Sequence, residues 1–294
     1  MEKISREQMI EMAKETRKKV TNAVVPDEEM QKYPVTMEKL LIPTRMGEAQ
    51  AYYSYSEQGQ QSDMMVINYH GGGFIRERTP NDELFCRKLN HALGCKVLDV
   101  DYKIAPDYPY PTAVYETYDV MQWVYENRAK FGIDEKKIVV AGHSAGGNLA
   151  IVDTMIAKKE QTFCPAMVVA DYPPLDIYTD PEEKPYRGEG IPAERARLYN
   201  LYYCEREQQK ESYVSPVYAK DEELENFPPS LFITAGLDSL CTEAEDFALR
   251  LARLGNEVTL KRFNGTGHAF TIYRKEKHQE GFELIVKSIK GNIL

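Results

Sequence analysis

Gly142-His143-Ser144-Ala145-Gly146 is the stretch of sequence that decides the fold. This G-x-S-x-G spacing follows an apolar run at residues 137–141 and opens a segment with helical spacing at residues 145–157. In this context the motif predicts a strand that enters a helix through one tight turn, with glycines where side chains would collide. Such a turn exposes the Ser144 hydroxyl as a nucleophile. A glycine-rich turn that serves packing alone stays the alternative.

Short runs of β-forming residues alternate with helical stretches on both sides of this motif. Two helical stretches are residues 112–131 and 145–157. This alternation predicts right-handed crossovers and a mostly parallel central sheet flanked by helices, an α/β fold. A leading pair of strands is expected at residues 39–42 and 50–55. The core strands are expected at residues 64–70, 96–102, 137–141, 166–170, 230–235 and 257–263.

Two segments lie outside this alternation. The first is a helix predicted to run to about Ala23, and the second is residues 172–227, which are rich in Pro, Glu and Tyr. An insertion after the carboxyl end of a core strand lies above the sheet edge where ligands bind in open α/β folds. We therefore expect a single domain over residues 1–294, with a cap built from about residues 1–25 and 172–227. A helical layer without a binding role stays the alternative.

A second glycine motif, His70-Gly71-Gly72-Gly73, directly follows the apolar run at residues 64–67. Consecutive glycines let backbone amides approach an oxygen that gains negative charge during acyl transfer. We expect the amides of Gly72 and Gly73, with that of Ala145, to form this oxyanion hole. A phosphate cradle is a weaker interpretation, because neither glycine motif continues as G-K-[ST] or spells G-x-G-x-x-G.

Among the histidines, His268 is the candidate general base. It lies in a loop with Gly265 and Gly267, just past the strand expected at residues 257–263. There an imidazole can reach over the sheet edge toward Ser144. His143 is poorly placed, because successive side chains on a strand point to opposite faces. The other three are His70 in the glycine motif and His91 and His278 in helical stretches.

Asp238 is the candidate acid. Known hydrolases with a serine between flanking glycines carry their acid between the serine and the histidine along the chain. Asp238 follows the apolar run at residues 231–235, which places it at the end of a core strand. Its expected role is to hold the His268 imidazole in the correct tautomer. Glu243 and Asp246 fall in the next helical stretch, where we expect them to face solvent.

Composition excludes several partners. The chain has a formal net charge of −9, and no basic stripe interleaved with aromatic residues offsets it, so nucleic acid and anionic lipid surfaces are not expected partners. There is no long apolar run to span a membrane and no apolar core of a secretory signal in residues 1–20, which favours a soluble, cytoplasmic protein. A small molecule is the expected ligand. A homodimer, the commonest closed assembly, is compatible with the sequence.

Taken in order, these motifs resemble the hormone-sensitive-lipase-like family of α/β-hydrolases, which includes bacterial esterases and lipases. The resemblance runs from about residue 40 to the C-terminus. It departs from the family pattern at His143, where many members carry Asp, and at Thr242, where a second Asp often precedes Glu243. The residues that carry it are His70–Gly73, residues 101–107 with Pro109 and Pro111, residues 142–150, Ser215, Pro216, Pro228, Pro229, Gly236, Asp238, Leu240, His268 and Phe270.

The resemblance implies an α/β-hydrolase fold with a helical cap, and hydrolysis of esters of short to medium acyl chains without a metal or organic cofactor. We expect a two-step acyl transfer in which Ser144 is the nucleophile, His268 the base and Asp238 the acid. A non-catalytic small-molecule binder on the same fold is one alternative. A lactonase, peptidase or acyltransferase with the same triad is another, because fold and triad alone do not select the reaction.

Overall fold

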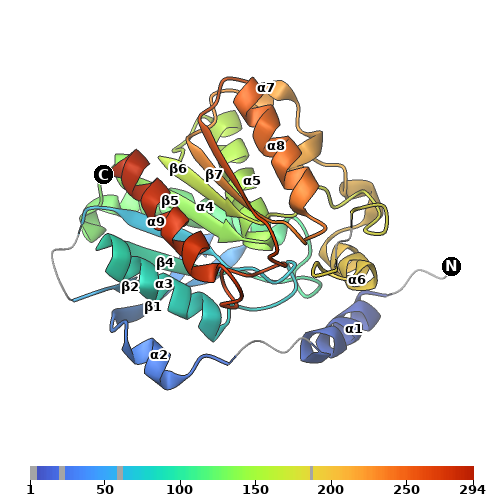
Figure 1. Ribbon diagram of the computed structural model, residues 1–294, viewed down its shortest axis with the longest axis horizontal. Helices are drawn as coiled ribbons and strands as arrows, with labels where there is room; N and C mark the ends of the chain where they lie inside the picture. Colours follow the sequence, from blue (N-terminus) through green and yellow to red (C-terminus); the bar gives the residue numbers. More distant parts are fainter. Residues whose placement is uncertain (1–4, 20–23, 58–61, 186–187) are drawn as a thin grey trace.

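Strands of the chain assemble into one central eight-stranded sheet in the order β1-β2-β4-β3-β5-β6-β7-β8 (Figure 1). The computed structural model describes residues 5–19, 24–57, 62–185 and 188–294. β2 pairs antiparallel with β1 and with β4, and the strands from β4 to β8 pair in parallel. The mostly parallel sheet predicted from the sequence is therefore confirmed.

Strand positions follow the predicted apolar runs closely. The six core strands begin and end within two residues of the expected bounds, whereas the two leading strands are longer than predicted. The longer leading strands pair over their whole length through a tight turn, from Thr36 opposite Tyr55 to Thr44 opposite Gly47. The bounds are β1 Thr36–Thr44, β2 Gly47–Tyr55, β3 Met65–Tyr69, β4 Lys96–Asp101, β5 Ile138–His143, β6 Met167–Asp171, β7 Ser230–Ala235 and β8 Val258–Phe263.

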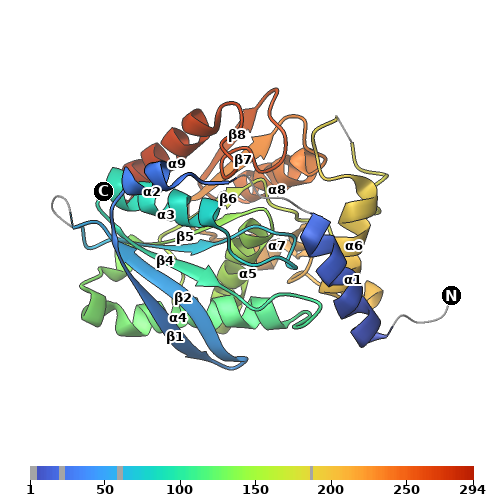
Figure 2. The same ribbon diagram turned by 90° about the horizontal axis from the view of Figure 1, so that it is seen from below.

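Helices cover both faces of the sheet, as Figure 2 shows for α3 and α9 on one side and α4 on the other. Buried side chains of α4, α5 and α8 share one core with the sheet, while those of α3 and α9 belong to a second core on the opposite face. Within the ranges given above, none of the helices combines the length and apolar character needed to cross a bilayer. The bounds are α3 Pro80–Leu93, α4 Thr112–Phe131, α5 Ala145–Glu160, α8 Cys241–Arg253 and α9 His278–Ile293.

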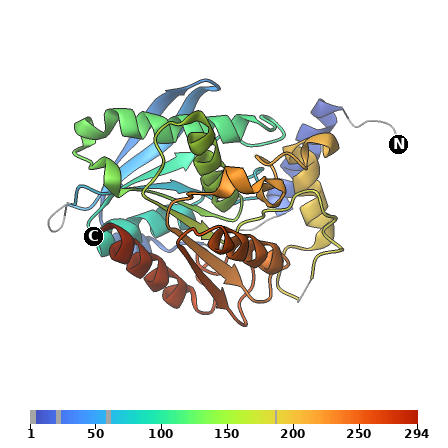
Figure 3. The same cartoon turned by 90° about the horizontal axis from the view of Figure 1, so that it is seen from above.

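Two helices distant in sequence, α1 (Arg6–Lys19) and α6 (Ala193–Tyr203), lie side by side at one end of the molecule (Figures 1 and 3). The Thr16 hydroxyl lies 3.4 Å from the Tyr202 hydroxyl across this contact. The predicted N-terminal helix is observed up to Lys19, and its expected continuation over residues 20–23 lies outside the described residues. The shorter helices are α2 Asp27–Gln31 and α7 Asp221–Leu224, with 3₁₀ turns at Glu135–Lys137, Arg206–Gln208 and Pro216–Tyr218.

Candidate active site

Ser144 occupies the turn between β5 and α5 in a strained backbone conformation, with φ 51° and ψ −120°. Glycines on both sides make this turn feasible. A Cβ atom at Gly142 would collide with the Gly146 carbonyl, and one at Gly146 would collide with the carbonyl of Tyr69 at the end of β3. The G-x-S-x-G motif thus brings the end of β3 against the start of α5, and Ser144 lies at the carboxyl edge of the sheet.

The three side chains that the sequence singled out form one continuous hydrogen-bonded chain. His268 Nε2 lies 2.9 Å from Ser144 Oγ, and His268 Nδ1 lies 2.6 Å from Asp238 Oδ2. Because a carboxylate accepts, Nδ1–H is the donor and Nε2 is left to accept the serine proton. The Asp238 side chain is fully buried, while that of His268 is 14% exposed. Asp238 therefore fixes the orientation of the imidazole through Nδ1, while the edge with Nε2 is accessible to a ligand.

Backbone contacts hold the loops that carry these two residues. Asp238 lies between β7 and α8, and its own amide donates to the Ala235 carbonyl at the end of β7. The His268 amide donates to the carbonyl of Glu189, a residue of the long segment between β6 and β7. That segment is thus attached directly to the loop that presents the imidazole.

The glycine motif after β3 lies beside Ser144. Gly72 and Gly73 have φ values of 129° and 62°, which residues with side chains rarely adopt. A Cβ atom at Gly73 would collide with the ring of Tyr199 on α6. Ala145 is the first residue of α5, so its amide has no partner within the helix. The glycine motif and the first turn of α5 thus both adjoin Ser144.

His70 holds this glycine motif in place through contacts of its ring and its backbone carbonyl. Its ring stacks on Tyr102 with centroids 4.2 Å apart, and its Nδ1 lies 2.7 Å from the Gly71 carbonyl oxygen. The Tyr102 hydroxyl in turn donates to the His70 carbonyl at 2.9 Å. The assignment of His70 to the glycine loop, made from its position in the sequence, agrees with these contacts.

His143 belongs to a buried polar network that sequence reasoning missed. Its Nδ1 lies 2.9 Å from Asp171 Oδ2, on the neighbouring strand β6, and both side chains are almost inaccessible. The Thr271 hydroxyl donates to the same carboxylate oxygen and lies 2.6 Å from the Tyr172 hydroxyl. The network links the serine turn to the loop that follows His268. The available signal was Asp171 itself, an acidic residue at the end of a predicted core strand.

Glu243 does not face solvent, so that expectation was wrong. Its Oε1 accepts the amides of Leu175 at 2.8 Å and Asp176 at 3.1 Å, and its Oε2 lies 2.5 Å from Lys184 Nζ. Burial raises the pKa of Glu243, and the Lys184 ammonium opposes that shift. The helical spacing of α8 did not reveal this contact, because it depends on the segment between β6 and β7 folding back over the helix. Asp246 is exposed, as expected.

A cavity of about 180 Å³ opens beside Ser144 and His268. Charged side chains of both signs stand at it, including Arg76, Glu77 and Arg195. Among the residues that the structure describes, no group of three or more His, Cys, Asp or Glu side chains is arranged to hold a metal ion. The Ser144 hydroxyl and the His268 imidazole both face this cavity, and the Asp238 carboxylate holds the imidazole from behind the cavity lining.

A family model described as alpha/beta hydrolase fold matches residues 66–272. The chain belongs to the α/β-hydrolase family. This α/β-hydrolase is similar to an arylesterase of Saccharolobus solfataricus, with 31% identity over 220 residues that cover 74% of this chain and 71% of that protein. It is also similar to bovine hormone-sensitive lipase, with 32% identity over 117 residues that cover 40% of this chain and 16% of the lipase.

Solved structures of esterases are similar to this chain over nearly its whole length. The hyperthermophilic esterase from Pyrobaculum calidifontis is 31% identical, covers 97% of this α/β-hydrolase and 92% of its own chain, and superposes with a TM-score of 0.81. The comparisons confirm both the fold class and the hormone-sensitive-lipase-like branch that the sequence motifs indicated.

Proposed function

We propose that this α/β-hydrolase is a serine carboxylesterase that cleaves small esters through an acyl-enzyme on Ser144. The observation that carries the proposal is the hydrogen-bonded series from the Ser144 hydroxyl through His268 to the Asp238 carboxylate. The esterases among its relatives support the same reaction class.

In the first step Ser144 Oγ attacks the ester carbonyl carbon while His268 Nε2 takes the hydroxyl proton. The carbonyl oxygen becomes an oxyanion, for which the amides of Gly72, Gly73 and Ala145 are the proposed donors. The carbon–oxygen bond to the alcohol then breaks, and His268 returns the proton to the departing alcohol oxygen. The Asp238 carboxylate stabilises the imidazolium that forms.

In the second step water attacks the acyl carbon and gives a proton to His268. The bond to Ser144 Oγ breaks, the carboxylic acid leaves, and the proton returns to the serine. We further propose that residues 1–25 and 172–227 form the cap over this site. Ile191 and Tyr199, both from the second segment, line the cavity beside Ser144, and α1 packs beside α6.

The first prediction tests the nucleophile. Ser144→Ala removes the attacking oxygen, so turnover of p-nitrophenyl acetate is expected to fall by at least about a thousandfold, as for other serine hydrolases that lose their nucleophile. Ser288→Ala, a serine-to-alanine change in α9, serves as the matched control and is expected to keep wild-type turnover. The measurement is the steady-state turnover of p-nitrophenyl acetate by the wild type, Ser144→Ala and Ser288→Ala. Wild-type turnover by the Ser144→Ala variant overturns the assignment.

A panel of substrates separates the proposed reaction from its alternatives. The wild-type protein is expected to hydrolyse aryl and alkyl acetates faster than a lactone or a p-nitroanilide. Preferential cleavage of the lactone or the anilide contradicts the carboxylesterase assignment, and tight ligand binding without cleavage of any ester indicates a binder.

A further inference from the structure

The loop that presents His268, residues 264–277, connects β8 to α9 without a helix or strand of its own. Sites on loops are held less precisely than sites on helices and strands, unless neighbouring elements fix the loop. On one side the Glu189 carbonyl accepts the His268 amide. On the other side, three residues beyond His268, Thr271 is 6% exposed and directs its hydroxyl to the central sheet. This hydroxyl makes two contacts that bear on the imidazole.

The first contact binds Thr271 to Asp171 at the end of β6. The Thr271 hydroxyl donates to Asp171 Oδ2, and His143 Nδ1 lies 2.9 Å from the same oxygen. The Asp171 side chain is inaccessible to solvent. A buried carboxyl oxygen that loses a hydrogen-bond donor costs free energy, so Asp171 and Thr271 hold one another in place. The His268 loop is thereby attached to a strand of the sheet.

The second contact binds Thr271 to Tyr172. The two hydroxyl oxygens are 2.6 Å apart. Thr271 has a single hydroxyl proton, which it gives to Asp171, so Tyr172 is the donor in this pair. At its other end, the Tyr172 amide donates to the Ile233 carbonyl of β7 at 2.7 Å. The Tyr172 ring, which is 2% exposed, is therefore held both at its backbone and at its hydroxyl.

Tyr172 packs directly against the His268 imidazole. The two rings meet edge to face, with centroids 5.0 Å apart and planes inclined at 64°. The hydrogen bond from Nδ1 to Asp238 leaves the imidazole able to tilt about that bond, and the contact with Tyr172 restricts the tilt. Tyr172 lines the cavity beside the nucleophile, whereas Thr271 and Asp171 do not. Thr271 thus reaches the imidazole only through the tyrosine ring and the loop backbone.

We propose that Thr271 is a positioning residue for the general base, because its hydroxyl fixes the tyrosine against which the His268 imidazole packs. The proposal rests on the proposed carboxylesterase function, in which His268 transfers a proton in both steps. A proton is transferred only when the two heavy atoms lie within hydrogen-bond reach, and a misplacement of about 1 Å costs about a hundredfold in rate. Loss of the hydroxyl is therefore expected to slow both steps, while substrate binding changes little.

The test compares two substitutions that separate the hydroxyl of Thr271 from its methyl group. Thr271→Val keeps the shape and removes both hydrogen bonds, so kcat for p-nitrophenyl acetate is expected to fall at least about tenfold, with KM within about twofold of wild type. The burst of p-nitrophenolate separates acylation from deacylation, and both rates are expected to fall. Thr271→Ser keeps the hydroxyl and removes the methyl group, which lies beside Gly281 of α9. Its kcat is expected to stay within about threefold of wild type.

Thr154→Val is the matched control. Thr154 is fully buried in α5, and its hydroxyl donates to the Ala150 carbonyl of the same helix at 2.9 Å. This variant loses a buried hydrogen bond that has no connection to the His268 loop, so its kcat and KM are expected to match the wild type. Urea unfolding of each variant shows whether it is folded under the assay conditions.

Tyr172→Phe breaks the same contact from the other side and keeps the ring, so it tests the proposal even if Thr271→Val fails to fold. Its kcat is expected to fall at least about threefold with KM unchanged. Wild-type kcat in Tyr172→Phe or in Thr271→Val overturns the proposal, and so does an equal loss in Thr271→Ser or in Thr154→Val. Absence of turnover of every ester by the wild-type enzyme contradicts instead the carboxylesterase function on which the proposal rests.

Discussion

His143, the residue before Ser144, forms a buried pair with Asp171, and this pair explains why the chain has a histidine at this position. Many relatives indicated by the motif resemblance carry Asp where His143 stands. Here the carboxylate comes from Asp171 on the adjacent strand, 2.9 Å from the imidazole, and Phe85 packs edge-on against the same ring. The chain thus places an acid–imidazole pair at this position, with its carboxylate on the neighbouring strand.

Replacing His143 by the residue common in relatives is therefore expected to be damaging. In His143→Asp two carboxylates share a buried site, and an uncompensated buried charge costs about 3–5 kcal/mol of unfolding free energy. His143→Asn keeps a neutral donor for Asp171 and is expected to cost less. Urea unfolding at pH 7 of both variants measures the difference. Equal stability of the two variants contradicts the proposed charge repulsion.

At the scale of elements, Glu245 of α8 binds side chains of β7 and β8, the last two strands of the sheet. Its Oε1 accepts from Thr234 of β7 at 2.7 Å and from Arg262 Nε of β8 at 2.7 Å. The Cys241 thiol also donates to it. Burial alone would raise the pKa of Glu245, but the hydrogen bonds led by Arg262 outweigh that effect and lower the pKa from 4.5 to about 2. The charged form of Glu245 thus stabilises the contact between α8, β7 and β8.

A carboxyl group whose pKa is lower in the folded than in the unfolded protein stabilises the fold at pH values above its unfolded pKa. This stabilisation is lost as the pH falls toward its folded pKa. The contribution of Glu245 is therefore expected to be complete above pH 4.5 and to disappear between pH 4.5 and about 2. Glu245→Gln is expected to lower the unfolding free energy at pH 7 by about 1–2 kcal/mol, since Arg262 is partly exposed.

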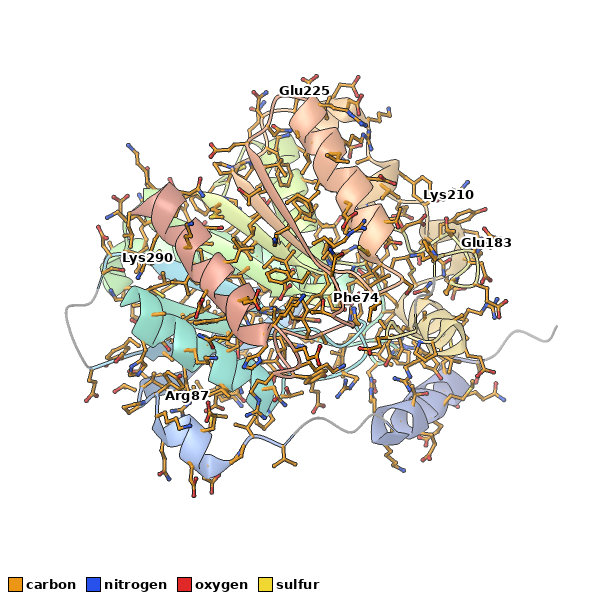
Figure 4. The ribbon with its side chains drawn as sticks, in the orientation of Figure 1. Phe74, Arg87, Glu183, Lys210, Glu225 and Lys290 are labelled. Atoms are coloured by element: carbon orange, nitrogen blue, oxygen red, sulfur yellow. The ribbon has the colours of Figure 1, made fainter. Side chains whose placement is uncertain are left out.

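Urea unfolding of wild type and Glu245→Gln from pH 7 to pH 3 tests this expectation. The difference between the two proteins is expected to narrow below pH 4.5. Glu225→Gln, a change at a side chain that Figure 4 shows on the surface, is the control and is expected to match wild type. A constant difference between wild type and Glu245→Gln across this pH range is inconsistent with the assigned role.

At the scale of the whole molecule, α1 reaches back to the loops that carry the site. Arg17 donates from Nε to the Ile75 carbonyl at 2.6 Å, and from Nη2 to the Ala105 carbonyl at 2.8 Å and to Asp107 at 2.7 Å. Ile75 lies two residues beyond Gly73 in the glycine motif. One side chain thus connects the N-terminal helix to the loop that presents the proposed oxyanion donors.

Arg17→Met is expected to loosen this loop. Loss of three charge-assisted contacts at a half-buried site should lower kcat/KM for p-nitrophenyl acetate by about tenfold and the unfolding free energy by about 1–3 kcal/mol. Lys18→Met is the matched control, because Lys18 lies next to Arg17 and pairs with Glu15 of the same helix on an exposed surface. If both variants show the same kinetics, α1 has no role in positioning the loop.

Much of the fold and of the candidate site could be predicted from the sequence, because the features that determine them depend on residues close together along the chain. The turn at Ser144 needs glycines at fixed offsets from the serine, and the parallel strands needed only short apolar runs between helical segments. Asp238 and His268 could be named because each follows a predicted strand, and the carboxyl ends of parallel strands meet at one edge. The hydrogen bond of His268 with Asp238 spans 30 residues of sequence and that with Ser144 spans 124, so both are a property of the fold.

Other features were decided only by tertiary structure. The helical spacing of α8 indicated an exposed Glu243, yet Lys184 and two backbone amides bury it once the segment between β6 and β7 folds over the helix. The Asp171 partner of His143 comes from the neighbouring strand, and the Tyr199 ring that lies against Gly73 comes from α6. The sequence by itself determined which residues sit at the ends of strands and turns, because backbone geometry and apolar spacing act over a few residues. Burial, charge pairing and cavity size depend on segments far apart in the chain, and only their packing in three dimensions decides them.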